Sequence, residues 1–303
     1  MPANIRPSIR LAALPSRRSF YDRFRLAAEA GFEGIELEAN DGPPDLLREA
    51  AERAGLVIHS VHCFANYSYP LSSGDPEILA RGIAVTLDAL EAARLLGAET
   101  LLLIPGIVED GTTYRQAYER SHQIIMRDIL PVAVEKNIVL AIENVWNGFL
   151  LSPIEYVQYV DSFGSPFVRP YFDVGNAIFG RPEGWIDIAG SRIVKLHLKD
   201  FRFEGGNAKG WWGLTRIGEG DVNWPEVRAA LDRAGFSGWG TLAEPDLIRG
   251  RNLSRVYFTV RKASAELAPL PGATAFLGLI QTWLARRLLR DVMQRFRRHI
   301  ARA

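Results

Sequence analysis

The hydrophobic positions of this chain fall into short apolar runs separated by longer segments of helical periodicity. Eight of the short runs predict β-strands: Ile9–Ala13, Gly34–Leu37, Leu56–Val61, Thr100–Ile104, Ile138–Ile142, Val168–Phe172, Ile193–Leu198 and Gly240–Ala243. The intervening periodic segments predict helices at Phe20–Ala30, Pro44–Ala54, Pro76–Leu96, Tyr114–Lys136, Pro153–Phe163 and Trp224–Ala234. Repeated alternation of strand and helix indicates parallel strands joined by crossover helices.

Eight strand–helix units favour a closed barrel over an open sheet. An open nucleotide-binding sheet usually carries a glycine-rich turn after its first strand. Here the first apolar run is followed by Pro15–Arg18, which contains no glycine. We therefore predict an α/β fold, a single (β/α)8 TIM barrel over residues 1–266.

The last forty residues depart from this alternation. Two prolines in Leu267–Gly272 interrupt the chain, and Leu284–Ala303 has the pattern of a basic amphipathic helix. Its apolar face would carry Leu284, Leu288, Val292, Phe296 and Ile300. Seven arginines and one aspartate from residue 286 onward give this tail a charge of +6, and the rest of the chain −5. We predict that residues 267–303 form a C-terminal helical extension that packs on the barrel or on another subunit. A membrane-surface helix and a disordered tail are the alternatives.

Composition narrows the class of protein. The formal net charge is only +1, so the chain lacks the basic field that nucleic-acid binding requires. We expect no membrane span, because no stretch reaches roughly 18 apolar residues, and no signal peptide, which together predict a cytoplasmic protein. The single cysteine, Cys63, excludes an intrachain disulfide and a cysteine-rich zinc site, and its apolar surroundings indicate a small buried residue.

Polar side chains end four consecutive strands of the predicted barrel. They are Glu143, Asp173, His197 and Glu244, and the alternation of the seventh strand points His197 toward the barrel axis. Active sites of such barrels lie at the C-terminal ends of the strands. Three carboxylates meeting there would repel one another unless a cation neutralised them. Three oxygen donors and one imidazole suit Mn²⁺, Mg²⁺ or Co²⁺, so we predict one divalent metal ion.

The chain resembles the sugar phosphate isomerase/epimerase family of xylose isomerase-like barrels over roughly residues 8–262. The motifs that carry the resemblance are Leu140–Glu155, Tyr171–Asn176, Val194–Phe201 and Gly218–Trp224. By similarity to the ketose 3-epimerases, Glu143, Asp173, His197 and Glu244 would bind one metal ion, with Mn²⁺ the first choice. The resemblance also implies that Glu143 and Glu244 form the acid–base pair, and that the protein associates into a homo-oligomer.

The implied activity is that of a metal-dependent isomerase or epimerase acting on a sugar or sugar phosphate in carbohydrate metabolism. A proton beside a ketone is too weakly acidic to leave unaided, and a metal ion that holds the neighbouring oxygens would stabilise the enediolate. One carboxylate would remove the proton from one face, and the other would return it from the opposite face.

The substrate contacts that we predict are His62, Trp146, Asn176, Asp200 and Arg202. Ketose 3-epimerases carry a histidine three residues after the metal aspartate, where this chain has Asn176, which can donate to a hydroxyl but carries no charge. Arg202 is the nearest match to a sugar-binding arginine of the relatives, one residue out of register. His59 lies three positions before His62, so we expect it to face the other way.

Several other functions stay open. Dehydratases and C-glycoside-cleaving enzymes of the same barrel family also begin by removing a proton beside a carbonyl. A DNA-repair endonuclease of this superfamily would use a histidine-rich trinuclear zinc cluster, whereas this chain has five histidines in all. A non-catalytic sugar-binding protein is disfavoured, because an unused cluster of buried carboxylates would be costly to keep. The sequence separates neither epimerisation from aldose–ketose isomerisation nor a free sugar from its phosphate.

Overall fold

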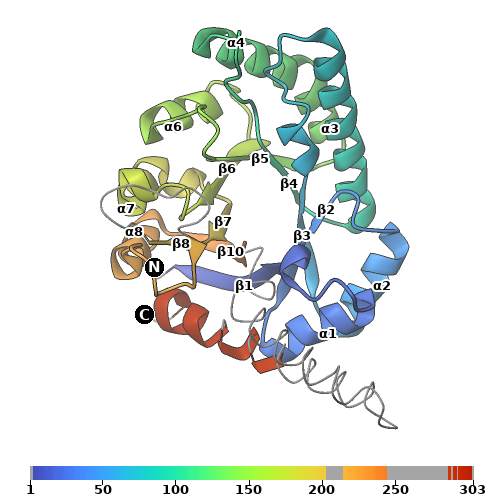
Figure 1. The fold of residues 1–303 in the computed structure, drawn as a ribbon, viewed down its shortest axis with the longest axis vertical. Helices are drawn as coiled ribbons and strands as arrows, with labels where there is room; N and C mark the ends of the chain where they lie inside the picture. The colour runs from blue at the N-terminus through green and yellow to red at the C-terminus, as the bar shows by residue number, and fades with distance from the viewer. Residues whose placement is uncertain (1–2, 203–213, 244–285, 288, 292, 302–303) are drawn as a thin grey trace, which may run out of the picture.

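The computed structural model describes residues 3–202, 214–243, 286, 287, 289–291 and 293–301 (Figure 1). Eight parallel strands close into a barrel in the order β1-β10-β7-β6-β5-β4-β3-β2. The strands are β1 (Asn4–Arg10), β2 (Gly34–Glu38), β3 (Val57–His62), β4 (Thr100–Leu103), β5 (Val139–Glu143), β6 (Val168–Asp173), β7 (Lys195–Leu198) and β10 (Ser237–Leu242). A short antiparallel ribbon, β8 (Asp200–Phe201) with β9 (Leu214–Thr215), follows β7. The predicted TIM barrel is confirmed.

Helices surround the barrel on its outer side (Figure 1). They are α1 (Phe20–Ala30), α2 (Pro44–Ala54), α3 (Pro76–Leu96), α4 (Tyr114–Ile124), α5 (Leu130–Glu135), α6 (Pro153–Asp161), α7 (Pro182–Ala189) and α8 (Trp224–Ala234). Glycines in the left-handed conformation end α1, α2, α3 and α8, as expected where a Cβ would be strained. The segment predicted as one helix at 114–136 contains a π-helical turn, Ile125–Ile129, just before Pro131, which lacks a backbone donor. Helix α7 was not predicted, because its eight residues are too few for a clear hydrophobic period.

The predicted first strand, Ile9–Ala13, is wrong in its bounds. The strand spans Asn4–Arg10, and Leu11–Ala13 forms a 3₁₀ turn. Ser8 and Arg10 alternate with apolar residues and make polar contacts inside the barrel, with His59 and with carboxylates of β2 respectively. A search for continuous apolar runs overlooks such a strand, because its inward face is polar.

A β-bulge in β3 overturns the expectation for His59. Ile35 of β2 pairs with Ile58, but Glu36 pairs with Ser60, so His59 has no partner in β2. His59 Nε2 lies 2.6 Å from Ser8 Oγ, and its ring stacks on Trp239 of β10. Strands β1 and β2 separate β3 from β10 in the sheet, so these contacts run through the barrel interior. The bulge therefore turns both His59 and His62 inward.

The main hydrophobic core lies between the strands and the helices, whereas the barrel interior is largely polar. A small apolar cluster inside the barrel comprises Leu102, Ile104, Ala141 and Tyr171. Buried polar side chains occupy much of the remaining interior, among them Ser8, Glu36, His59, His62 and Thr241. Cys63 is buried as predicted, and burial raises the pKa of its thiol to about 12. An interior this rich in polar groups indicates a binding or catalytic site.

The C-terminal helix, whose described residues are 286, 287, 289–291 and 293–301, packs on the barrel between α8 and α1, beside β1 (Figure 1). Its last turn, Arg297–Ala301, is π-helical. Its buried side carries Leu289, Met293, Phe296 and Ile300. Phe296 and Ile300 belong to the predicted apolar face, and Leu284, Leu288 and Val292 lie outside the described residues. The boundary proposed at residue 266 also falls outside them and stays a prediction. Within the part of the chain that the structure describes, no helix has the length and apolar character that a membrane crossing requires.

Candidate active site

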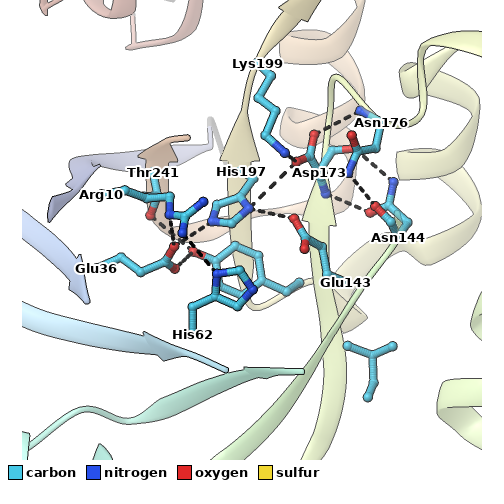
Figure 2. A network of polar contacts seen from close by, with 12 residues as sticks. Arg10, Glu36, His62, Glu143, Asn144, Asp173, Asn176, His197, Lys199 and Thr241 are labelled. Atoms are coloured by element: carbon cyan, nitrogen blue, oxygen red, sulfur yellow. Dashed lines mark hydrogen bonds and ion pairs between the residues drawn. The ribbon is translucent and has the colours of Figure 1, made fainter. Parts of the chain in front are cut away.

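Three of the predicted metal ligands meet inside the barrel. Glu143 ends β5, Asp173 ends β6, and His197 lies on β7 directly beside Asp173 in the sheet register. His197 Nδ1 lies 2.7 Å from Glu143 Oε1 and 3.7 Å from Asp173 Oδ2 (Figure 2). One ligand atom from each residue lies within 4.8 Å of the others, and all three side chains are buried. The fourth predicted ligand, Glu244, lies outside the described residues, so its role stays a prediction.

Glu36, which was not among the predicted site residues, completes the surroundings of His197. Glu36 Oε1 of β2 lies 2.8 Å from His197 Nε2, on the opposite side of the ring from Glu143 (Figure 2). Glu36 also accepts a hydrogen bond of 2.6 Å from the Tyr171 hydroxyl and lies 3.5 Å from Arg10 Nε. The alternation of β2 could have predicted the inward position of Glu36. Gly34, Glu36 and Glu38 share one face of the strand, opposite to the apolar Ile35 and Leu37.

Opposite charges control the protonation of this cluster. Burial alone would lower the pKa of His197, but the carboxylates of Glu36 and Glu143 outweigh it and raise that pKa to about 9. Burial would likewise raise the pKa of Glu143, yet the charge and hydrogen bond of His197 bring it to about 2. His197 and Arg10 hold the pKa of Glu36 well below its usual range against the same burial. In the metal-free protein at neutral pH, His197 is therefore a cation between two ionised glutamates.

Asp173 is the carboxylate of this cluster whose pKa lies above its usual value. Burial raises its pKa, and although the nearby ammonium of Lys199 opposes that shift, the charge of Glu143 adds to it. Lys199 Nζ contacts Asp173 Oδ2, while Asp173 Oδ1 accepts a 2.9 Å hydrogen bond from the Asn176 backbone. Asn144 exchanges two hydrogen bonds with the backbone of Asp173, which fixes the end of β6 against the end of β5.

The donor chemistry of this cluster fits a divalent cation. Two buried carboxylates and one imidazole are ligands that Mn²⁺, Mg²⁺ and Co²⁺ accept. In the metal-free protein, the protonated ring of His197 and the ammonium of Lys199 neutralise the same carboxylates. A cation that bound here would replace the proton of His197, because a metal ligand must offer a lone pair.

The predicted substrate contacts divide into two groups. His62, Trp146 and Asn176 lie around the cluster: His62 Nδ1 lies 3.1 Å from Glu38 Oε1, and Trp146 Nε1 donates to the Asn176 carbonyl at 2.6 Å. The Trp146 ring packs against Phe179 and Phe201.

Asp200 and Arg202 instead bind the segment between β9 and α8. Asp200 accepts hydrogen bonds from the backbone of Gly218, Gly220 and Val222 and from Trp224 Nε1, at 2.8–3.2 Å. The exposed Arg202 donates to the Glu219 carbonyl. The structure thus brings neither side chain into contact with the Glu143–Asp173–His197 cluster, and their part in substrate binding stays a prediction.

Comparison with known proteins agrees with this architecture. The model of the xylose isomerase-like TIM barrel family matches residues 24–252. The putative L-ribulose-5-phosphate 3-epimerase SgbU of Escherichia coli (strain K12) is 26% identical over 244 residues, covering 75% of this chain and 84% of that protein. The L-ribulose-5-phosphate 3-epimerase UlaE of Salmonella paratyphi C (strain RKS4594) is 23% identical over 278 residues, covering 84% and 94%. The crystal structure of D-allulose 3-epimerase from Methylomonas sp. with additional C-terminal residues superposes with a TM-score of 0.69 at 19% identity, covering 97% of this chain and 99% of the other. Because the family model spans most of its length, this chain belongs to the xylose isomerase-like TIM barrel family.

Proposed function

We propose that this protein is a divalent-metal-dependent epimerase of a sugar or sugar phosphate, which moves a proton at the carbon beside a ketose carbonyl. The observation that carries the proposal is the buried cluster of Glu143, Asp173 and His197 at the C-terminal ends of three neighbouring strands. Active sites of this architecture lie at that end of the barrel. Proteins named as 3-epimerases are similar to the chain over most of its length, which supports the same reaction class.

Glu143, Asp173 and His197 would hold the cation, with Glu244 as the proposed fourth ligand and Mn²⁺ as the first choice of metal. When bound, a divalent cation polarises the oxygens beside the reacting carbon and offsets the negative charge that develops there. His197 and Asp173 need no other role, since neither has to exchange a proton with the substrate.

Glu143 is the proposed proton acceptor. Its low pKa keeps it ionised at neutral pH, so its weak basicity must be offset by position in a buried site. Inversion requires a second group on the opposite face of the substrate, and we assign that role to Glu244. The two glutamates would exchange roles when the epimer reacts in the reverse direction.

Buried polar atoms around the cluster support a hydroxyl-rich substrate. Among the described residues, neither His62 Nε2 nor Asn176 Oδ1 has a hydrogen-bond partner, although both atoms are buried. Buried polar atoms normally have partners, and sugar hydroxyls can both donate and accept. The ring of Trp146, packed on Phe179 and Phe201, adds an apolar surface of the kind that a sugar ring covers.

Deuterium exchange tests the proposal directly. Metal-stripped protein is incubated in D₂O with a panel of ketoses and ketose phosphates, with and without Mn²⁺, and the substrate is followed by NMR. We expect Mn²⁺-dependent incorporation of deuterium at the carbon beside the carbonyl, together with formation of the epimer. Glu143→Gln should lower the exchange rate by about 100-fold or more, since general base catalysis contributes on this scale.

Glu135→Gln is the matched control, because Glu135 ends α5 and its side chain is exposed. This variant should exchange at the wild-type rate. If the protein binds Mn²⁺ but exchanges no proton of any sugar in the panel, the epimerase proposal is wrong. Formation of an unsaturated product with loss of water would assign the site to a dehydratase instead.

A further inference from the structure

Glu36 contacts His197 on the side that faces away from the other carboxylates. Figure 2 shows the imidazole between Glu36 on one side and Glu143 and Asp173 on the other. The Glu36 side chain is fully buried, and it comes from β2, across the barrel from β6 and β7. A buried carboxylate is costly unless it is paired, so its position here calls for a reason.

The contacts of Glu36 fix which of its oxygens His197 meets. The Tyr171 hydroxyl donates to Oε2 at 2.6 Å, which leaves Oε1 to face His197 Nε2 at 2.8 Å. Arg10 Nε lies 3.5 Å from the same Oε1 and balances part of its charge. The Tyr171 hydroxyl in turn lies 3.2 Å from Thr241 Oγ1 of β10. The Glu36 carboxylate therefore contacts Arg10 of β1 and Tyr171 of β6, and Tyr171 is itself bound to β10.

The two nitrogens of an imidazole cannot be exchanged for each other at a metal site. Once a cation replaces the proton on Nδ1, a hydrogen bond donated by Nε2 to Glu36 keeps the remaining proton on Nε2 and the lone pair on Nδ1. Nδ1 is the nitrogen that faces Glu143 and Asp173. Without an acceptor at Nε2, the ring could take the other tautomer or rotate, and in either case Nδ1 would no longer point its lone pair at the cluster.

We propose that Glu36 is a positioning residue that holds His197 with Nδ1 ready to bind the metal, and that Tyr171 anchors Glu36 in this role. The inference rests on the proposed metal site and adds two residues that do not themselves bind the ion. Neighbouring Glu38 provides a contrast on the same face of β2, because it contacts Arg10 and His62 but makes no contact with His197.

Metal affinity, measured without substrate, tests the role of Glu36. Titration of metal-stripped protein with Mn²⁺ by calorimetry should give about 10- to 100-fold weaker binding for Glu36→Gln, the usual effect of losing the partner of a metal-bound histidine. Tyr171→Phe keeps the carboxylate but frees it to turn, so its affinity should fall by less, roughly threefold to tenfold. Glu38→Gln, the matched control, should bind Mn²⁺ within about twofold of wild type.

An NMR signature separates positioning from general loss of structure. With Zn²⁺ as a diamagnetic metal, the Nε2 proton of His197 should give a slowly exchanging imidazole resonance in the wild type. The resonance should broaden or vanish in Glu36→Gln, while circular dichroism of this variant stays that of a folded barrel.

Each outcome decides a different question. If the wild type binds neither Mn²⁺ nor Zn²⁺, the metal site of the proposed function fails. If the wild type binds Mn²⁺ and Glu36→Gln binds it equally well, the positioning role is wrong. Should Glu36→Gln not fold, Tyr171→Phe decides, and wild-type Mn²⁺ affinity in that variant would overturn the inference.

Discussion

Lys199 Nζ contacts Asp173 Oδ2, so the lysine that directly follows β7 neutralises the carboxylate that ends β6. Both side chains are buried, and Asp173 is the carboxylate of the cluster whose pKa is raised overall, with burial as the largest cause. A divalent cation at the cluster would compete with this ammonium for the same oxygen. We therefore expect Lys199 to stabilise the protein without a metal ion and to weaken the binding of a divalent cation at the proposed site.

The first prediction follows from that competition. Lys199→Met removes the positive charge but keeps a side chain of similar length, leaving Asp173 buried beside Glu143. The free energy of unfolding of the metal-free protein should fall by about 3 kcal/mol, the scale on which breaking a buried ion pair acts. Mn²⁺ should then restore more stability to the variant than to the wild type, as measured by thermal unfolding with and without the ion. Equal stabilisation of both proteins by Mn²⁺ would contradict the competition.

The stability of the metal-free protein should depend on pH through His197. Its pKa is about 9 in the folded state and near 6.5 when unfolded, so the folded state binds the proton more tightly. This contribution is fully present below pH 6.5 and is lost as pH rises through 9, and it amounts to something on the order of 3 kcal/mol. Urea unfolding between pH 6 and 10, with chelator present, measures the decline.

His197→Gln provides the control for this titration. The variant should be less stable at pH 6 but should lose little further stability between pH 6.5 and 9. If other groups caused the decline, the free energy of unfolding of the variant would fall with pH as steeply as that of the wild type.

Three residues of the cluster could be singled out in the sequence because each stands where an apolar run meets a polar residue. Glu143 and Asp173 directly follow buried residues of β5 and β6, and His197 interrupts the apolar alternation of β7. Glu36 was missed because it lies inside a short run whose other residues are mostly apolar. Its partners, Arg10 and Tyr171, are distant in the sequence, and only the closed barrel brings them to it.

The differences between the predicted and the observed strands have local physical causes. The alternation of two faces cannot reveal a bulge, and one extra residue in β3 was enough to turn His59 inward. Strand β1 was displaced in the prediction because its interior positions are Ser8 and Arg10 rather than apolar residues. Regular helices with capping residues and final glycines, such as α3, were predicted with their exact bounds.

Arg228 should be important for docking of the C-terminal helix. From α8, its Nη1 donates to the Ile300 carbonyl at 2.6 Å and its Nη2 to the Ala3 carbonyl at 2.8 Å. Arg228→Met should lower the free energy of unfolding by roughly 2–3 kcal/mol, because hydrogen bonds from charged groups act on this scale. Hydrogen exchange should show faster exchange of the C-terminal helix, with β5 and β6 protected as in the wild type. If hydrogen exchange in that helix were unchanged, the contacts of its apolar side alone would be enough to hold it on the barrel.

Gly175 lies between Asp173, a proposed metal ligand, and Asn176, where there is no room for a side chain. A Cβ at this position would lie 2.7 Å from the Lys199 Cβ and 2.8 Å from a ring carbon of Phe201. Gly175→Ala should therefore push the end of β6 away from β7, lowering the free energy of unfolding by about 1–3 kcal/mol and weakening Mn²⁺ binding.

Gly184→Ala in α7 is the matched control, because nothing lies within 4 Å of its Cβ position. Alanine favours a helix over glycine by about 0.5–1 kcal/mol, so this variant should unfold at a slightly higher temperature and bind Mn²⁺ like the wild type. Opposite shifts in the two variants would tie the effect of Gly175 to crowding at the site, whereas destabilisation of both would point to a general intolerance of alanine.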